Sequence, residues 1–202
     1  MAIFLLPLNL KTERYIYNII YTYLKFNNML SKELHEAMNQ QINAELWSAY
    51  LYLSMSMDAE AKGFKGIANW FYIQFMEEQD HARIFMNYMN SRDAEVTLLP
   101  IAEVRTKWES PLEMFKDTLE HEKEVTAMIN NLVSIATKDN DYASKNALIW
   151  FVNEQVEEEE NARDLIHDFE AIQGNKYGCY MLDKELKSRV YATPSPLAAK
   201  GE

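Results

Sequence analysis

Glutamate and histidine side chains occur in this sequence at spacings that suit a metal ion. Glu78 and His81 are three residues apart, and on a helix this spacing places one side chain above the other. Glu45 lies before this pair, beside the apolar Leu46, and Glu122 lies after it, next to His121. An ionised carboxylate buried without a partner is costly or takes up a proton. Several such groups near a core therefore indicate bound cations.

A fourth acidic segment, Glu154-Gln155-Val156-Glu157-Glu158-Glu159-Glu160, follows later in the chain. In bundles that hold two iron ions, two helices each give one Glu and the other two each give a Glu-x-x-His motif, all pointing inward. Glu45 and Glu122 match the lone glutamates, and Glu78-x-x-His81 matches the full motif. Gln155-x-x-Glu158 occupies the place of the second motif, without its histidine.

Each of these features alone has a simpler interpretation. His81 by itself suits a core histidine with a backbone partner, and the acidic run 157–160 suits a solvated face. Tyr52 and Trp150 by themselves suit packed core aromatics. The metal hypothesis depends on their joint occurrence, once each, in the required order and on four successive predicted helices.

The segments that carry these residues have helical periodicity. Residues 32–61 repeat apolar side chains at spacings of three and four, which keeps them on one face. Lys62-Gly63-Phe64-Lys65-Gly66 predicts a break, and a second periodic run extends from Ile67 to Met89. A link this short makes the two helices antiparallel neighbours.

A capping signal predicts where the third helix begins. In Ser110-Pro111-Leu112-Glu113, Ser is the N-cap, Pro is the first helical residue and Glu completes a capping box. This helix runs to about Thr137, residues 138–141 turn the chain, and a fourth helix runs from Tyr142 to about Ile172. Residues 91–109 lack periodicity and are long enough to cross the whole bundle. The sequence therefore predicts an all-α, ferritin-like antiparallel four-helix bundle with a long crossover between helices two and three.

The remaining segments define the expected domain limits. A short fifth helix is predicted at about residues 180–189, after Gly174 and Gly178, and residues 191–202 form a Pro-containing tail. The main domain then covers residues 29–190, with the four-helix bundle ending at about 172. Residues 1–28 are nearly free of acidic side chains and are expected to be an N-terminal extension outside the fold. Their apolar stretch is too short for a membrane helix and lacks the features of a secretory signal.

Composition excludes several classes of function. A formal net charge of −11 argues against nucleic-acid binding, which needs clustered Lys and Arg. The single cysteine, Cys179, excludes paired Cys-x-x-Cys metal ligands, so oxygen and nitrogen ligands must do the chemistry. No membrane partner is expected.

Over residues 29–190 the chain resembles the non-haem bacterial ferritins. The resemblance is carried by Asn43-Ala44-Glu45-Leu46 with Tyr52, by Glu77 to Arg83, by the Asp141-Tyr142 turn and by Trp150 to Glu159. It implies that Glu45, Glu78 and His81 bind one iron ion. It further implies a second ion bound by the bridging Glu78 with Glu122 and Glu158, with Gln155 nearby. A third site, on the cavity side, would use Glu77, Glu154, Glu157 and Glu158.

The resemblance also implies an activity and an assembly. It implies a cytoplasmic ferroxidase that oxidises Fe(II) with dioxygen or peroxide, and a homo-oligomer of 24 subunits that encloses a ferric mineral. Iron is then both substrate and cofactor, and no haem is expected. Tyr52, seven residues after Glu45, resembles the ferritin tyrosine that hydrogen-bonds near the irons or donates an electron. The absent second histidine implies a looser second ion than in proteins that keep a permanent di-iron cofactor.

Three other functions suit the same bundle. A rubrerythrin-like di-iron peroxidase or oxidase would use the site without storage, and the absence of a Cys-x-x-Cys module argues against it. A mini-ferritin that protects DNA would place its iron between subunits and normally lacks a fifth helix. A metal-free structural bundle leaves the clustered carboxylates unexplained.

Overall fold

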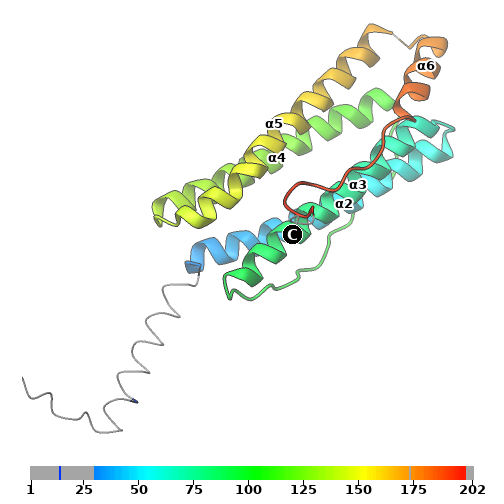
Figure 1. Ribbon diagram of the computed structural model, residues 1–202. Coiled ribbons are helices and arrows are strands. Elements are labelled where there is room, and N and C mark those ends of the chain that lie inside the picture. The colour runs from blue at the N-terminus through cyan, green and yellow to red at the C-terminus, as the bar shows by residue number, and fades with distance from the viewer. Residues whose placement is uncertain (1–13, 15–29, 173, 199–202) are drawn as a thin grey trace, which may run out of the picture.

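The computed structural model describes residues 14, 30–172 and 174–198. In that part of the chain the regular elements are α2 (Lys32–Ala61), α3 (Lys65–Ser91), α4 (Pro111–Lys138), α5 (Tyr142–Ala171) and α6 (Lys176–Leu186), all helices. The first four lie along one another as a bundle, and α6 sits at one end (Figure 1). The all-α prediction with a long crossover and a short fifth helix is therefore confirmed. The predicted extension, residues 1–28, falls almost wholly outside the described residues.

Helix α2 begins and ends where the sequence pattern places it. Ser31 is its N-cap, and the Ser31 hydroxyl accepts a hydrogen bond from the Leu34 amide at 3.1 Å. Helix α3 begins two residues before the predicted start, within the predicted break. Its N-cap residue, Phe64, offers no side-chain cap. The Asp183 carboxylate of α6 accepts from the Gly66 and Ile67 amides instead, at 2.9 and 3.0 Å.

Helix α4 confirms the predicted cap at Ser110, whose hydroxyl accepts from the Glu113 amide at 3.2 Å. The second half of the predicted capping box differs. The Glu113 carboxylate accepts from the amide of Glu109, one residue before the N-cap, at 2.6 Å. It also pairs with Arg105 of the crossover, so this helix start is joined to the crossover as well as capped.

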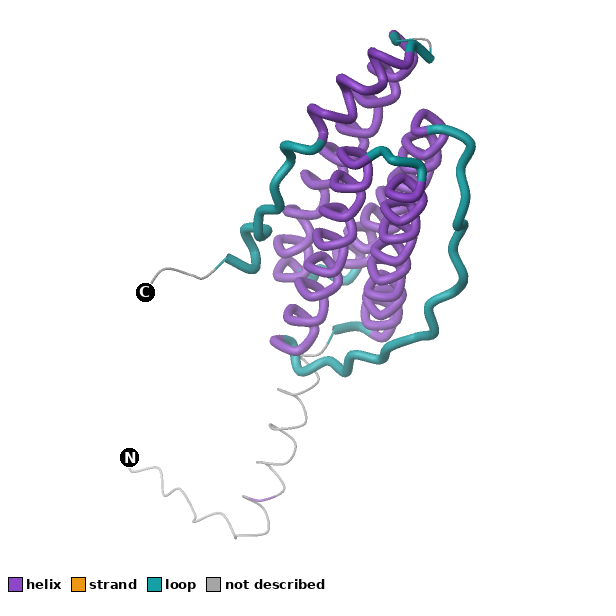
Figure 2. Tube along the Cα trace, turned by 90° about the vertical axis from the view of Figure 1, so that its right-hand side faces the viewer, coloured by secondary structure: helices purple, strands orange, loops and turns teal. Residues whose placement is uncertain are grey.

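The crossover runs the length of the bundle beside α2 (Figure 2). The Thr97 amide donates to the Asn39 side chain at 2.7 Å, and the Ser54 hydroxyl donates to the Arg105 carbonyl at 2.7 Å. At the far end the Trp108 amide donates to the buried Asp58 carboxylate at 3.1 Å. These contacts hold the crossover, which links α3 to α4, against α2.

Helix α6 begins four residues earlier than the predicted start at residue 180. Its N-cap is Asn175, whose side chain accepts from the Tyr177 and Gly178 amides. Gly178 therefore lies inside the helix, where a Cβ would meet the side chain of Ile172 at 2.9 Å. The predicted start after Gly178 was wrong, because this glycine lies within the helix and packs closely against Ile172.

Two separate apolar clusters form the core of the bundle. One includes Leu34, Met38, Phe85 and Ile129, and the other is built on the aromatic side chains of Trp70, Phe71, Trp108, Phe115 and Phe169. Most of the buried polar and charged side chains of the bundle lie between them along the helices. The fold thus places a polar layer in the middle of an otherwise apolar interior.

Candidate metal centre

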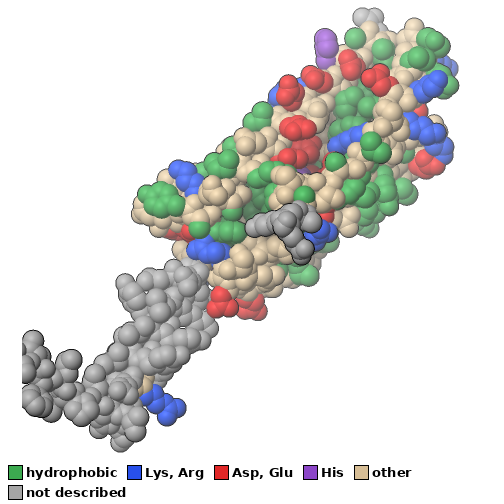
Figure 3. All heavy atoms as spheres, viewed as in Figure 1, with side chains coloured by type: hydrophobic (Ala, Val, Ile, Leu, Met, Phe, Trp, Pro, Cys, Tyr) green, Lys and Arg blue, Asp and Glu red, His purple; other side chains and the backbone are tan. Residues whose placement is uncertain are grey.

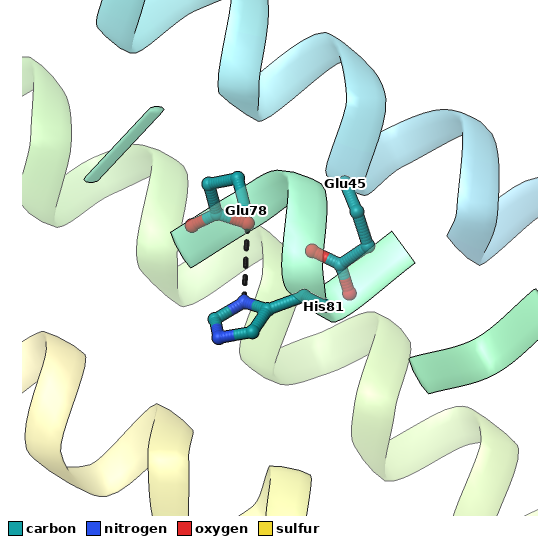
Figure 4. Close-up of side chains that lie close together, drawn as sticks. All are labelled: Glu45, Glu78 and His81. Atoms are coloured by element: carbon teal, nitrogen blue, oxygen red, sulfur yellow. Dashed lines mark hydrogen bonds and ion pairs between the residues drawn. The ribbon is translucent and has the colours of Figure 1, made fainter. Parts of the chain in front are cut away.

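Glu45, Glu78 and His81 converge in this polar layer. Helix α2 supplies Glu45, and α3 supplies Glu78 and His81 one turn apart (Figure 4). All three side chains are buried. One ligand atom from each lies within 4.8 Å of the others, and the His81 Nδ1 atom lies 3.3 Å from Glu78 Oε2. Two carboxylates and one imidazole at this separation form a group that can hold a metal ion.

Two atoms of this group are buried without a hydrogen-bond partner. Gln41 donates to Glu45 Oε1 at 2.9 Å, but Glu45 Oε2 has no partner, and neither has His81 Nε2. The nearest carboxylate to His81 Nε2 in an ion pair is Glu154, at 3.9 Å, which is too long for a hydrogen bond. Unpaired buried polar atoms cost free energy, and a bound cation would relieve that cost at whichever of these atoms it contacts.

The carboxylates of α4 and α5 are arranged differently. Glu122 accepts hydrogen bonds from the Tyr52 hydroxyl and, at 3.0 Å, from the Gln155 amide. Glu158 accepts from the Gln74 amide at 2.8 Å. All of these side chains are buried. This half of the centre is therefore bonded by neutral donors.

Burial and mutual repulsion change how the glutamates titrate. Burial, then the charge of Glu78, raises the pKa of Glu45 well above its ordinary value. Burial, then the charges of Glu122 and Glu158, raises the pKa of Glu78 in the same way. Burial and the charge of Glu158 raise the pKa of Glu122 to about 8. Burial and repulsion thus favour the protonated forms of these carboxylates, and we expect cation binding to displace protons from them.

The four residues of the predicted third site are spread over a partly exposed surface. Glu158 is buried, Glu77 and Glu154 are half-buried, and Glu157 is exposed. Acidic side chains gather over α5 on this face (Figure 3). Among the described residues, only Glu45, Glu78 and His81 bring three His, Cys, Asp or Glu ligand atoms within 4.8 Å. Neither the predicted second site nor the third reaches that convergence, and both stay predictions.

Sequence reasoning overlooked two buried amides. Gln41 lies four residues before Glu45, and Gln74 lies four residues before Glu78, so each shares a helix face with a predicted ligand. Gln41 donates to Glu45 on its own helix, whereas Gln74 reaches across to Glu158 on α5. The four-residue spacing could have predicted that each amide lies on the same helix face as a ligand. It could not have predicted that Gln74 contacts α5.

His121, beside Glu122, stays outside the cluster. The Ser48 hydroxyl lies 2.7 Å from His121 Nε2, and the ring packs against Trp47 with centroids 5.1 Å apart. Burial lowers the pKa of His121 to about 4, so the ring is neutral at neutral pH. His121 is therefore a half-buried, packed histidine outside the cluster.

The fold and the buried centre together define a class of protein: four-helix bundles with a buried carboxylate and histidine group that can hold a metal ion. The chain matches the Ferritin-like domain over residues 35–172 and belongs to that family. It is 38% identical over 161 residues to a bacterial non-heme ferritin of Bacteroides fragilis, covering 80% of this chain and 100% of that one. A Staphylococcus aureus bacterial non-heme ferritin is also 38% identical, over 163 residues, 81% of this chain and 98% of that one.

Solved structures give the same result. An open pore ferritin from the archaeon Archaeoglobus fulgidus is 42% identical, with a TM-score of 0.79, covering 80% of this chain and 99% of that one. A humanized archaeal ferritin superposes with a TM-score of 0.80 at 41% identity, covering 81% of this chain and 99% of that one.

None of the helices in the described residues is long and apolar enough to span a membrane.

Proposed function

We propose that this chain is a non-haem ferritin subunit that oxidises Fe(II) and stores the ferric product. The convergence of Glu45, Glu78 and His81 in the bundle interior carries the proposal, because two of their atoms are buried and unpaired. The names of the relatives, bacterial non-heme ferritin and open pore ferritin, support the storage role.

The ligand set suits iron in both oxidation states. Hard carboxylates favour Fe(III) because anionic oxygen neutralises its extra charge, and one imidazole is a common iron ligand. Glu45 and His81 would hold a first Fe(II), and Glu78 would bridge it to a second ion bound by Glu122 and Glu158. Each Fe(II) then gives one electron to dioxygen, which is reduced to the peroxide level while both ions become Fe(III). Iron is the substrate, and the oxidised ions leave for the mineral.

The second ion is expected to bind more loosely than the first. Gln155 offers a neutral amide where a histidine would complete a symmetric site, and that amide donates to Glu122. A cation there competes with this bond and the one from Tyr52 for the Glu122 oxygens. Loose binding suits a centre that passes iron on to a store.

We propose a cytoplasmic shell of 24 such subunits around the mineral.

A stopped-flow experiment tests the site. Replacing both Glu78 and His81 by alanine should abolish rapid Fe(II) oxidation, followed by the absorbance of the ferric product. The matched control is Asp164→Ala/His167→Ala, which removes an acid and a histidine at the same spacing from an exposed face of α5. An unchanged initial rate in Glu78→Ala/His81→Ala would show that this centre is not the ferroxidase.

A second measurement tests storage. Native mass after aerobic Fe(II) loading should show a large particle that retains iron. A particle that consumes peroxide and keeps only about two iron ions per subunit, the content of a paired site, would support the rubrerythrin-like alternative.

A further inference from the structure

The segment after α6 returns along α3. In Figure 1 it runs from the end of the bundle back beside α3 toward the middle of the molecule. The Asn69 amide donates to the carbonyl of Leu186 at 3.3 Å and to that of Arg189 at 3.0 Å. Two residues on, the Tyr191 hydroxyl donates to the Asp80 carboxylate. Contacts on both sides of Arg189 thus fix the backbone that carries it.

The Arg189 side chain is held by three groups of α3. Its guanidinium lies over the Trp70 ring, 4.7 Å from the centroid, and its Nη1 donates to the Trp70 carbonyl at 3.2 Å. Its Nη2 donates to Glu77 Oε2 at 2.7 Å. The two charged side chains are only 23% and 17% exposed, so solvent screens this ion pair less than an ordinary surface pair. A planar fork that stacks and bonds in this way is specific to arginine.

Glu77 is one of the four carboxylates proposed for the third cation site. Glu154 and Glu158, also in that set, lie close enough to act on Glu77 electrostatically. The guanidinium therefore occupies one oxygen of a carboxylate that a metal ion would need. It also adds one positive charge at the edge of the site.

We propose that Arg189 is an internal counter-cation for the third site, which competes with metal ions for Glu77. A metal ion that enters this site must displace the guanidinium from Glu77 Oε2 or bind the remaining oxygen beside a positive charge. The C-terminal segment thereby weakens the third site and favours onward movement of iron over retention. This inference rests on the proposed function for the identity of the cation, but its geometry does not depend on oxidation.

Terbium luminescence tests the proposal without iron chemistry. Tb³⁺ prefers oxygen ligands, as hard cations do, and nearby aromatic side chains can sensitise its emission. In the assembled full-length protein, Arg189→Gln should tighten the weakest Tb³⁺ site roughly three- to tenfold, the net size of one ordinary hydrogen bond. Lys187→Gln removes the same charge from an exposed residue two positions away and should leave that site unchanged.

Two further variants separate competition from a structural effect. In Glu77→Gln, the added change Arg189→Gln should give no further gain, because the shared carboxylate is gone. Arg189→Lys keeps the charge but loses the stacked planar fork, so its gain should be smaller than that of Arg189→Gln. An equal gain in Lys187→Gln, a gain that persists in Glu77→Gln, or no gain at all would overturn the proposal. Absent Fe(II) oxidation alongside the expected Tb³⁺ pattern would instead count against the ferroxidase.

Discussion

The two halves of the polar layer use similar residues in different states. On α2 and α3, Glu45 and His81 each leave a buried atom unpaired beside Glu78. On α4 and α5, the carboxylates of Glu122 and Glu158 accept hydrogen bonds from neutral side chains. A cation would meet unpaired atoms in the first half, whereas in the second it competes with existing hydrogen bonds. From this difference we expect the cation affinity of each half to depend on what its carboxylates already contact, and not only on their number.

The largest expected effect separates the two halves by their affinity for Zn²⁺, which is not oxidised. Glu45→Ala should weaken the tighter of two Zn²⁺ sites by about 10- to 100-fold or more, as losses around a metal commonly do. Glu122→Ala should keep the tighter site and lose the weaker one. Isothermal titration of the metal-free protein measures both. Equal losses in the two variants would show that the halves bind as one unit.

The second prediction concerns the stability of the metal-free protein. The pKa of Glu122 is raised to about 8 from an ordinary value of 4.5. A group whose pKa is raised by folding contributes stability that is fully present below its unfolded pKa and is lost as pH rises through its folded pKa. The Tm of the metal-free protein should therefore fall between about pH 5 and pH 8.5, as calorimetry can measure.

Two controls sharpen this pH dependence. Glu122→Gln carries no titrating proton, so its Tm should vary less over the same range. Saturating Zn²⁺ should raise the Tm most at the alkaline end, where protons no longer compete for the carboxylates. A Tm that rises with pH in the metal-free protein would contradict the protonated state inferred for this half.

The sequence predicted most of the fold because the relevant signals are local. Apolar spacing defined α2, and the Ser110-Pro111 cap defined the start of α4. The start of α3 was less accurate, because its cap is Asp183, more than a hundred residues later. No local pattern could indicate that contact. The start of α6 was likewise predicted too late, and the packing of Gly178 against Ile172 could not be seen in the local sequence.

The site shows the same division. The spacing of Glu78 and His81 placed them on one helix face, and the family resemblance added Glu45 to them. The pairing of Gln74 with Glu158 and of Arg189 with Glu77 depends on which helix faces meet in space. Periodicity predicts the helix face on which a side chain lies, but not the hydrogen-bond donor that it contacts on another helix.

A smaller effect is expected from removing one donor of the second half. Tyr52→Phe deletes the hydroxyl that donates to Glu122 and leaves the ring in the core. A second Zn²⁺ would no longer compete with that hydrogen bond, so it should bind roughly fivefold more tightly, the equivalent of about 1 kcal/mol. Tighter binding with slower Fe(II) oxidation would indicate that the hydroxyl also supplies an electron. Weaker Zn²⁺ binding would show that Tyr52 holds Glu122 in place for the metal.

The smallest effect on the first Fe(II) oxidation is expected from changes at the predicted third site, which lies outside both halves of the polar layer. Glu154→Gln/Glu157→Gln keeps size and helix propensity but removes two charges from the proposed third site. Glu154 approaches His81 only to 3.9 Å and Glu157 is exposed, so neither should limit the first, fast oxidation by more than about twofold, within the range of surface changes. The later handling of iron should change, either as oxygen consumed per iron or as the rate of mineral growth. Glu120→Gln/Glu124→Gln, on an exposed face of α4, is the charge-matched control. If the first oxidation and the later handling of iron both match those of that control, these glutamates form a solvated acidic face and do not bind iron.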